Sequence, residues 1–345
     1  MAVKMLVFDY RESERRYIEE HWNELNNFEI SFYEWSLNSE TLARLSDEDR
    51  DNTCVISVFI ESIIDREVIS GFKNLRVIST RSTGVDHIDK KACEERNIMV
   101  VNVESYGSTT VAQYTFGLLI ALARNIILAD LSIRSKNFCE RSFIGRNLGY
   151  LTLGVIGTGA IGANLCNYAS AFGMKILAYD LKPKLELMEK RNIQYVEFDA
   201  LLQNSDVISL HIPYTGDNYH LLGEREFSLM QSGAMIINTS RGELIDIKAL
   251  YENLNSGKLK GAALDVLECE DISFKCDELS ENLKAEAGLT CRQEVEILHK
   301  LADFHNVIIT PHIAYETQEA IDYILKASIN GIKDCLSGSS QYRVV

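Results

Sequence analysis

An apolar run passes into a glycine-rich loop at Leu153-Gly154-Val155-Ile156-Gly157-Thr158-Gly159-Ala160-Ile161-Gly162, and a helix-compatible segment, 163–172, follows at once. The G-x-G-x-x-G spacing is typical of a strand, a tight turn and a helix whose first N–H groups bind a phosphate. Gly157 would permit the turn, Gly159 would let the backbone approach a pyrophosphate, and Gly162 would let the helix pack closely on the strand. Taken alone the pattern is weak, because a glycine-rich turn of this kind also occurs without a ligand.

The next apolar run, 175–179, strengthens this interpretation because it ends at Asp180, where a dinucleotide-binding fold places an acidic residue. A carboxylate there can accept hydrogen bonds from both hydroxyls of an adenine ribose, and it would repel the 2′-phosphate of NADP. Lys182 and Lys184 lie nearby and could soften that preference. The sequence therefore predicts a site for NAD rather than NADP.

Composition and charge bound the other possibilities. The 345 residues, 46% of them hydrophobic, suit two domains better than one. Fifty acidic against 35 basic residues leave a formal net charge of −15, which argues against binding to nucleic acid or to an anionic membrane. The longest apolar stretch, 111–131, is interrupted by Gln113, Arg124 and Asp130, so it indicates a buried or interface helix rather than a membrane span. No signal peptide is recognisable, and we expect a cytoplasmic protein.

The cysteines are scattered, with no C-x-x-C pair and no Cys/His spacing typical of a zinc site. We therefore expect reduced structural thiols and no metal site. The eight positions are Cys54, Cys93, Cys139, Cys166, Cys269, Cys276, Cys291 and Cys335.

Apolar strands alternate with helical segments, and this rhythm predicts parallel sheets. One series of strands ends near residue 102 and a second begins at residue 153, with a long helical pattern, 109–135, between them. A last helix, 317–336, has no strand of its own, so we expect it to pack on the first domain. The glycine-rich domain would then be an insertion, with a cleft between the domains. The expected strands are 4–8, 28–32, 54–59, 75–80, 98–102, one starting at 153, then 175–179, 194–197, 207–210, 234–238, 262–266 and 307–310.

Three expected strand ends carry groups suited to the reduction of a keto acid. Arg241 lies in Asn238-Thr239-Ser240-Arg241-Gly242, where a guanidinium can hold a carboxylate at two points and polarise the adjacent carbonyl. Several carboxylates lie at or just past the end of the strand 262–266, namely Asp265, Glu268 and Glu270, and His312 follows Pro311. Each group is common as a structural residue. Together they favour hydride transfer, because carbonyl reduction needs a proton donor that titrates near neutrality, which a His–carboxylate pair supplies.

The glycine loop with Asp180, then 238–242, 261–270 and Pro311-His312, in this order, resemble the D-2-hydroxyacid dehydrogenase family, most closely its D-lactate dehydrogenases, including the vancomycin-resistance type. The resemblance covers almost the whole chain. It implies an α/β fold of two doubly wound parallel-sheet domains, in which a Rossmann NAD-binding domain, 105–312, is inserted into a flavodoxin-like substrate domain, 1–104 plus 313–345. It also implies a homodimer whose interface includes the helix 109–135.

The resemblance further implies the roles of site residues. Arg241 would bind the substrate, His312 would be the acid–base group, and Glu270 would be its partner, with Glu268 as the next candidate. In the first domain the backbone N–H groups of Thr83 and Gly84 would hold the substrate carboxylate. Tyr106 would lie beside the substrate, and Asp265 would face the nicotinamide ring. The implied cofactor contacts are Gly157, Thr158, Gly159, Ala160, Ile161, Gly162, Asp180, His211, Ile212, Pro213, Thr239, Ser240 and Asp265.

The leading hypothesis is NAD-dependent reduction of a small, pyruvate-like 2-oxo acid to the D-2-hydroxy acid. The apolar run at 58–60 favours a small or aliphatic substrate side chain. A branched, aromatic or phosphonate 2-oxo acid is an alternative substrate, and an NAD-sensing, corepressor-like binding module is an alternative from another class. The chain departs from the family at Gln113, where most members have glutamate, and in an acidic helical stretch, 281–299, to which the sequence assigns no function.

Overall fold

The computed structural model describes residues 3–10, 12–22, 28–103, 107–136, 143–189, 192–270 and 289–338. The chain forms two compact units, one made of Met1–Tyr106 with Glu316–Val345 and the other of Gly107–Tyr315. We call them the outer and the inserted unit. The sequence places these divisions at 104/105 and 312/313, a few residues away.

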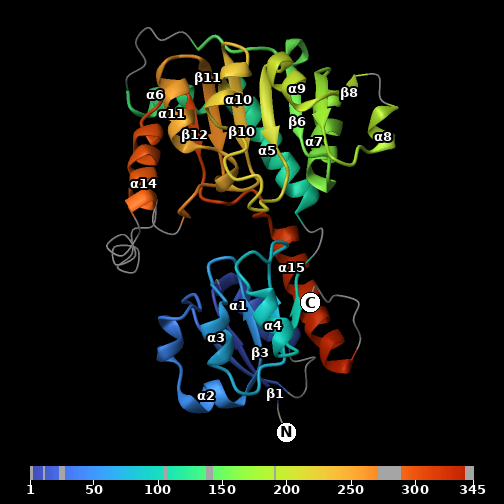
Figure 1. Ribbon diagram of the computed structural model, residues 1–345, viewed down its shortest axis with the longest axis vertical. Helices are drawn as coiled ribbons and strands as arrows, with labels where there is room; N and C mark the ends of the chain where they lie inside the picture. The colour runs from blue at the N-terminus through green and yellow to red at the C-terminus, as the bar shows by residue number, and fades with distance from the viewer. Residues whose placement is uncertain are drawn as a thin grey trace. The chain divides into compact units, whose positions relative to one another are not determined.

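The outer unit is a parallel sheet of five strands in the order β2-β1-β3-β4-β5, the flavodoxin-like order (Figure 1). Strands β3 and β4 are buried along almost their whole length, as in a sheet that is covered on both faces, although they also bury hydroxyls such as those of Ser57 and Ser79. Its strands are β1 (Val3–Val7), β2 (Phe28–Phe32), β3 (Thr53–Val58), β4 (Val77–Thr80) and β5 (Met99–Val101), and its helices are α1 (Glu12–Trp22), α2 (Asp47–Asn52), α3 (Arg66–Ser70), α4 (Lys90–Glu95) and α15 (Gln318–Ser337).

The C-terminal helix α15 belongs to this unit. It begins after Thr317, whose hydroxyl caps the Ala320 N–H, and it ends at Gly338 in the left-handed conformation. Its buried face, which includes Leu325 and Ile329, packs with strand residues such as Met5 in one core. The helix expected to pack back on the first domain therefore does so.

The inserted unit is a parallel sheet of seven strands in the order β12-β11-β10-β9-β6-β7-β8, the doubly wound order of dinucleotide-binding folds. The strand order reverses between the parallel strands β6 and β9, and ligands of such sheets bind at this switch point. Its strands are β6 (Thr152–Ile156), β7 (Lys175–Tyr179), β8 (Ile193–Tyr195), β9 (Val207–Leu210), β10 (Ala234–Asn238), β11 (Leu259–Leu264) and β12 (Val307–Ile309).

Two separate cores lie on the two faces of this sheet. One is covered by α5 (Ser108–Ala123) and α7 (Ala160–Ala171), and the other by α9 (Phe198–Asn204), α10 (Glu224–Leu229), α11 (Ile247–Asn255) and α14 (Leu289–Ala302) (Figure 1). The short helix α8 (Leu185–Met188) precedes β8. The two-domain α/β fold expected from the sequence is confirmed, with strand ends shifted by at most a few residues.

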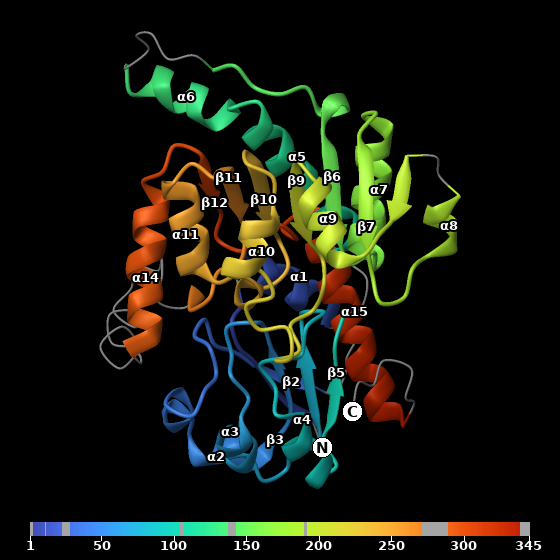
Figure 2. The same ribbon diagram turned by 45° about the horizontal axis from the view of Figure 1, so that its top comes forward.

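The prediction of one long helix at 109–135 is wrong, because the segment forms two helices, α5 and α6 (Ile126–Arg134). The chain bends by 65° between them. Asn125 breaks the helix by adopting the left-handed conformation, with φ of 53°. Helix α5 is buried in the core, whereas α6 extends away from the sheet (Figure 2) and exposes Ile126, Leu131 and Ile133. Among the described residues no single helix could span a membrane; only this bent pair meets the length and composition criteria.

The expectation of reduced thiols is wrong for one pair, because Cys269 and Cys291 form a disulfide. The partners are 22 residues apart in sequence, and only the packing of α14 beside the turn after β11 brings them together. Cys54, Cys93, Cys166 and Cys335 form no disulfide, while Cys139 and Cys276 lie outside the described residues.

The junction of β6 and α7 makes a stability prediction. A Cβ on Gly162 would lie 2.0 Å from the Gly157 carbonyl oxygen, whereas a Cβ on Gly159 would meet nothing within 4 Å. We expect Gly162→Ala to lower the free energy of unfolding by about 1–3 kcal/mol, the usual cost of overpacking. The matched Gly159→Ala should change it by no more than about 0.5 kcal/mol. Denaturant titration measures both, and equal losses would contradict the assigned packing.

Candidate active site

The glycine loop presents the N-terminus of α7 at the end of β6. Gly157 has a φ of +92°, and a side chain there would collide with the His211 carbonyl oxygen at 2.6 Å. Helix α7 starts at Ala160, directly after Gly159. The first N–H groups of a helix have no partner within it, so this end is suited to an anion. The structure thus places 157–162 as the sequence predicts for a phosphate-binding turn.

Asp180, just beyond β7, is tied to this loop. Its Oδ2 accepts hydrogen bonds from the Thr158 backbone N–H at 2.6 Å and the Thr158 hydroxyl at 2.9 Å, and its Oδ1 accepts one from the Lys182 N–H at 2.8 Å. Burial raises the pKa of Asp180, but these hydrogen bonds outweigh it, so the pKa lies below the ordinary value. The carboxylate is therefore ionised near neutral pH and fixed beside the loop.

Tyr195 is a member of this site that the sequence reasoning missed. Its hydroxyl donates to Thr158 Oγ1 at 2.8 Å and accepts from the Lys184 N–H at 3.0 Å. It lies at the end of β8, so β6, β7 and β8 all contribute to the loop. A tyrosine in a short edge strand gives no signal of this role in the sequence.

The second loop expected to contact the cofactor follows β9. His211 Nε2 bonds with the Ser209 hydroxyl at 2.8 Å, and burial lowers the pKa of His211 to about 3, so this imidazole stays neutral. The Ser240 hydroxyl donates to the Ile212 carbonyl oxygen, which joins the loop to the end of β10. Thr239 is buried and bonds with the Thr115 hydroxyl of α5 at 2.8 Å, while Pro213 accepts at its carbonyl from the Asn218 amide.

Arg241 follows β10 in extended backbone, with φ of −146°. The Asn238 side-chain amide donates to the Arg241 carbonyl oxygen at 2.8 Å, and the Arg241 guanidinium donates to the Ser240 carbonyl oxygen at 2.7 Å. A Cβ on Gly242 would lie 2.1 Å from the Leu267 carbonyl carbon, so the turn after Arg241 packs directly on the backbone that follows β11. The strand ends that carry the chemistry are thus held together by backbone contacts.

Asp265 organises the turn that carries His312. Its carboxylate is buried and accepts hydrogen bonds from the Thr310 hydroxyl at 2.5 Å, the Ile313 N–H at 3.1 Å and the Ala314 N–H at 2.9 Å. Its carbonyl oxygen also accepts the His312 N–H at 2.8 Å. This positioning function is visible only in the structure, since the sequence assigned Asp265 to the nicotinamide ring alone.

His312 and Glu270 are brought together although 42 residues separate them. The His312 Nδ1–H donates to Glu270 Oε2 at 2.8 Å, and Glu270 Oε1 accepts the Leu267 N–H at 2.8 Å. Burial lowers the pKa of His312, but the hydrogen bond and the charge of Glu270, with a smaller effect of Asp265, raise it above the ordinary value against the opposing Arg241 charge. With Nδ1 occupied, Nε2 is the nitrogen that can exchange a proton with a ligand.

Glu268, the alternative partner, lies against another histidine. Its Oε2 is 3.3 Å from His220 Nε2, and its Oε1 accepts the Tyr219 hydroxyl at 3.0 Å. The geometry therefore supports Glu270 rather than Glu268 as the partner of His312.

In the outer unit, the turn after β4 presents Thr83 and Gly84. Neither backbone N–H donates a hydrogen bond to a group in the described part of the chain. The turn is anchored by Arg81, which is fully buried and donates to the Phe8 and Asp9 carbonyl oxygens at 2.7 and 2.8 Å. Two N–H groups on a fixed turn suit a carboxylate. Tyr106 lies outside the described residues.

The two places where the sequence departs from the family pattern are Gln113 and the acidic stretch 281–299. Gln113 is exposed on α5. Of the acidic stretch 281–299, residues 281–288 lie outside the described residues, and the rest belongs to α14, which buries Val295, Leu298 and Leu301. The helix is therefore a packed element with one apolar face, not a wholly solvated one.

Comparisons with known proteins agree with these features. A model of the family described as D-isomer specific 2-hydroxyacid dehydrogenase, NAD binding domain, matches residues 116–314. The chain is 36% identical to a 2-hydroxyacid dehydrogenase homolog of Haemophilus influenzae over 97% of each chain. It is also 36% identical to an aromatic 2-oxoacid reductase of Clostridium sporogenes, over 81% of this chain and 82% of that protein. Its fold is similar to that of the D-lactate dehydrogenase from Aquifex aeolicus complexed with NAD and lactic acid, with a TM-score of 0.86, 33% identity and coverage of 99% of each chain.

The imidazole–carboxylate pair predicts a measurable pKa change. Glu270→Gln keeps the shape but removes the charge, so we expect the pKa of His312 to fall. Glu268→Gln is the matched control and should leave it unchanged, because Glu268 contacts His220. NMR titration of the histidine ring signals, assigned with His312→Asn, measures both. If the pKa of His312 fell in Glu268→Gln rather than in Glu270→Gln, Glu268 would be its partner instead.

Proposed function

The chain belongs to the D-isomer specific 2-hydroxyacid dehydrogenase family, and we propose that it reduces a small, pyruvate-like 2-oxo acid to the D-2-hydroxy acid with Arg241, Glu270 and His312. Members of this family are oxidoreductases, and the cofactor is NAD. The observation that carries the proposal is the hydrogen bond of 2.8 Å between His312 Nδ1 and Glu270 Oε2. It joins an acid–base group to a charge that keeps it protonated.

The inserted unit fits NAD. Gly162 packs against Gly157 with no room for a Cβ, and the space beside Gly159, at the first turn of α7, is open to a pyrophosphate. The ionised Asp180 can accept hydrogen bonds from ribose hydroxyls. The proposed contacts are those expected from the sequence, with Tyr195 as a support for Thr158. Bound NADH supplies the hydride for the substrate carbon.

His312 would donate a proton from Nε2 to the substrate oxygen during reduction and accept it during oxidation. The raised pKa keeps the imidazolium populated near neutral pH, where reduction needs it. Asp265 would hold the imidazole in place through the turn it organises, beside the role facing the nicotinamide that the resemblance implies.

Arg241 would bind the substrate carboxylate and polarise the adjacent carbonyl with its planar guanidinium. The N–H groups of Thr83 and Gly84 would also bind that carboxylate, and Tyr106 would contact the substrate. The role of Thr83 and Gly84 is supported by their N–H groups, which donate no hydrogen bond within the described residues, and by Arg81, which fixes the turn.

The substrate side chain is the finer part of the proposal. Phe59 and Ile60 are partly buried apolar residues after β3, which supports a small or aliphatic group. An aromatic 2-oxo acid is the second candidate, because the Clostridium sporogenes relative named for that activity is 36% identical.

The test is NADH oxidation with a panel of pyruvate, 2-oxoisocaproate, phenylpyruvate and a phosphonate analogue of pyruvate. We expect the highest kcat/KM for pyruvate; a higher value for phenylpyruvate would favour the second candidate.

Arg241→Lys should lose most activity although the charge is kept, since an ammonium does not reproduce a two-point contact. His312→Ala should lose about 10²–10⁴-fold, the usual contribution of a positioned acid–base group. Tight NADH binding without turnover of any member of the panel would refute the proposal.

Asp180 predicts the cofactor preference. Like charges about 4 Å apart repel by about 1 kcal/mol in water and about 4 kcal/mol near a protein surface. We therefore expect kcat/KM for NADH to exceed that for NADPH by about tenfold or more. Asp180→Asn should reduce the ratio, whereas Asp199→Asn, on the exposed side of α9, should not. A preference of the unmodified enzyme for NADPH would contradict the assignment.

We also propose a homodimer that acts in the cytoplasm. Helix α6 exposes Ile126, Ile127, Leu131 and Ile133 by 40–57%, an apolar surface that a second copy could cover. The cytoplasmic location is supported by the use of NAD and by the four cysteines that form no disulfide.

The α6 surface predicts the oligomeric state. The enzyme should have twice the 39.0 kDa chain mass in solution, and Leu131→Glu with Ile133→Glu should reduce it to the chain mass. Met188→Glu adds a charge at an exposed apolar residue of α8 and should leave the dimer intact. Light scattering after gel filtration measures the mass. A dimer that persists in the double variant would place the interface elsewhere.

A further inference from the structure

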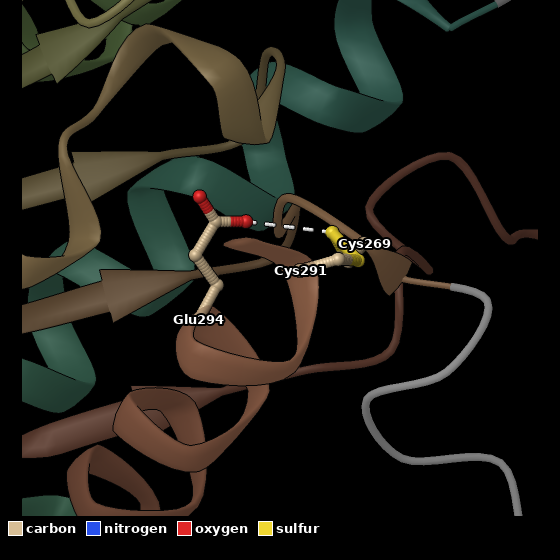
Figure 3. A group of neighbouring side chains, drawn as sticks. All are labelled: Cys269, Cys291 and Glu294. Carbon is tan, nitrogen blue, oxygen red and sulfur yellow. Dashed lines mark hydrogen bonds between the residues drawn. A yellow bond between two sulfur atoms is a disulfide. The ribbon is translucent and has the colours of Figure 1, made fainter. Parts of the chain in front are cut away.

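Two sulfurs and a carboxylate converge beside the turn that carries Glu270 (Figure 3). Cys269 belongs to the turn after β11, whereas Cys291 and Glu294 lie one helical turn apart on α14 and so share one face of that helix. The Cys269 Sγ is 3.4 Å from Glu294 Oε2, and one ligand atom from each residue lies within 4.8 Å of the others.

The same carboxylate joins a second set of potential ligands. Glu294, Glu268 and His220 also place one ligand atom each within 4.8 Å of the others. His220 Nε2 is 3.3 Å from Glu268 Oε2. Glu294 is therefore shared by two sets of potential ligands, one with the two cysteines and one with Glu268 and His220.

Glu294 is a buried carboxylate without a proper hydrogen-bond donor. Its side chain belongs to a residue only 8% exposed, and its hydrogen-bond contact within the described part of the chain is the Cys269 sulfur. A disulfide sulfur carries no proton and cannot donate one. Burial and the charge of Glu268 raise the pKa of this carboxyl, so its ionised form needs a cation or a donor nearby.

We propose that Cys269, Cys291 and Glu294 bind a zinc ion when the disulfide is reduced, with His220 or Glu268 as a fourth ligand. Thiolates select zinc over magnesium and calcium, and a set of sulfur, oxygen and imidazole ligands is typical of tetrahedral zinc. With Zn–S of about 2.3 Å and Zn–O of about 2.0 Å, the tetrahedral angle sets sulfur and oxygen ligands about 3.5 Å apart. The Cys269–Glu294 contact of 3.4 Å already meets that requirement.

The zinc site forms after the disulfide is reduced. A dithiol reductant is oxidised to its disulfide, and its two electrons and two protons convert the Cys269–Cys291 bond into two thiols. Zinc then displaces two protons from these thiols and binds both thiolates. Because Glu270 directly follows Cys269, the ion would fix the turn that bears the partner of His312.

The test uses the full chain, reduced with dithiothreitol, freed of reductant and metal under nitrogen, and titrated with Co²⁺ and then Zn²⁺. We expect one equivalent of Co²⁺ per chain, with the absorption of thiolate-to-cobalt charge transfer, and its displacement by Zn²⁺. Atomic emission should find one zinc per chain. The oxidised chain should bind neither ion in this way.

Matched variants assign the ligands. Cys291→Ser and Glu294→Gln should each weaken binding by more than about tenfold, the least that loss of even a supporting partner costs a metal site. Cys54→Ser, a free cysteine of the outer unit, and Glu296→Gln, an exposed carboxylate on α14, should bind as the unmodified chain does. Circular dichroism and NADH binding verify that each variant is folded. Absence of stoichiometric binding by the reduced chain, equal binding by the oxidised chain, or unchanged binding by Cys291→Ser or Glu294→Gln would overturn the proposal.

Discussion

The buried carboxylate of Asp265 holds the chemical centre of the inserted unit in place. It stands at the end of β11, and it receives one hydroxyl and two backbone N–H groups from the turn after β12. Its own N–H donates to the Asn238 carbonyl oxygen at the end of β10. Three neighbouring strand ends are thereby tied to one residue. A buried carboxyl group is tolerated here because donors satisfy its oxygen atoms.

The two turns that carry the His312–Glu270 pair contain backbone conformations that would otherwise be unfavourable. His312 has a φ of +55° and Cys269 a φ of +56°, in the left-handed region that side chains rarely adopt. Such residues cost about 1–3 kcal/mol each and persist where their surroundings fix them. The turns at both residues deliver the two members of the His312–Glu270 pair to each other, so the unfavourable geometry coincides with the proposed acid–base centre.

Three carboxylates of the inserted unit suit different proposed functions because their surroundings differ. Asp180 is surrounded by donors and stays ionised at the cofactor loop, while Glu270 has one oxygen on a backbone N–H and the other on an imidazole. Glu268, two residues away from Glu270, lies with Tyr219, His220 and the buried Glu294. One short turn thus contributes Glu270 to the proposed acid–base pair and Glu268 to a cluster with the chemistry of a metal site.

The sequence by itself determined the doubly wound fold, the phosphate-binding turn and Asp180, because glycine spacing, apolar runs and strand-end residues are local patterns. It also indicated Arg241 and His312 by their places after strands. The resemblance named Glu270 as the partner of His312, and the structure places the two in contact. Only the tertiary structure decided that Asp265 organises the His312 turn and that α5 and α6 bend at Asn125. It alone joined Cys269 to Cys291 and Glu294. The reason is physical: these contacts link residues distant in sequence, and their partners depend on how α14 and the strand ends pack, which no local spacing records.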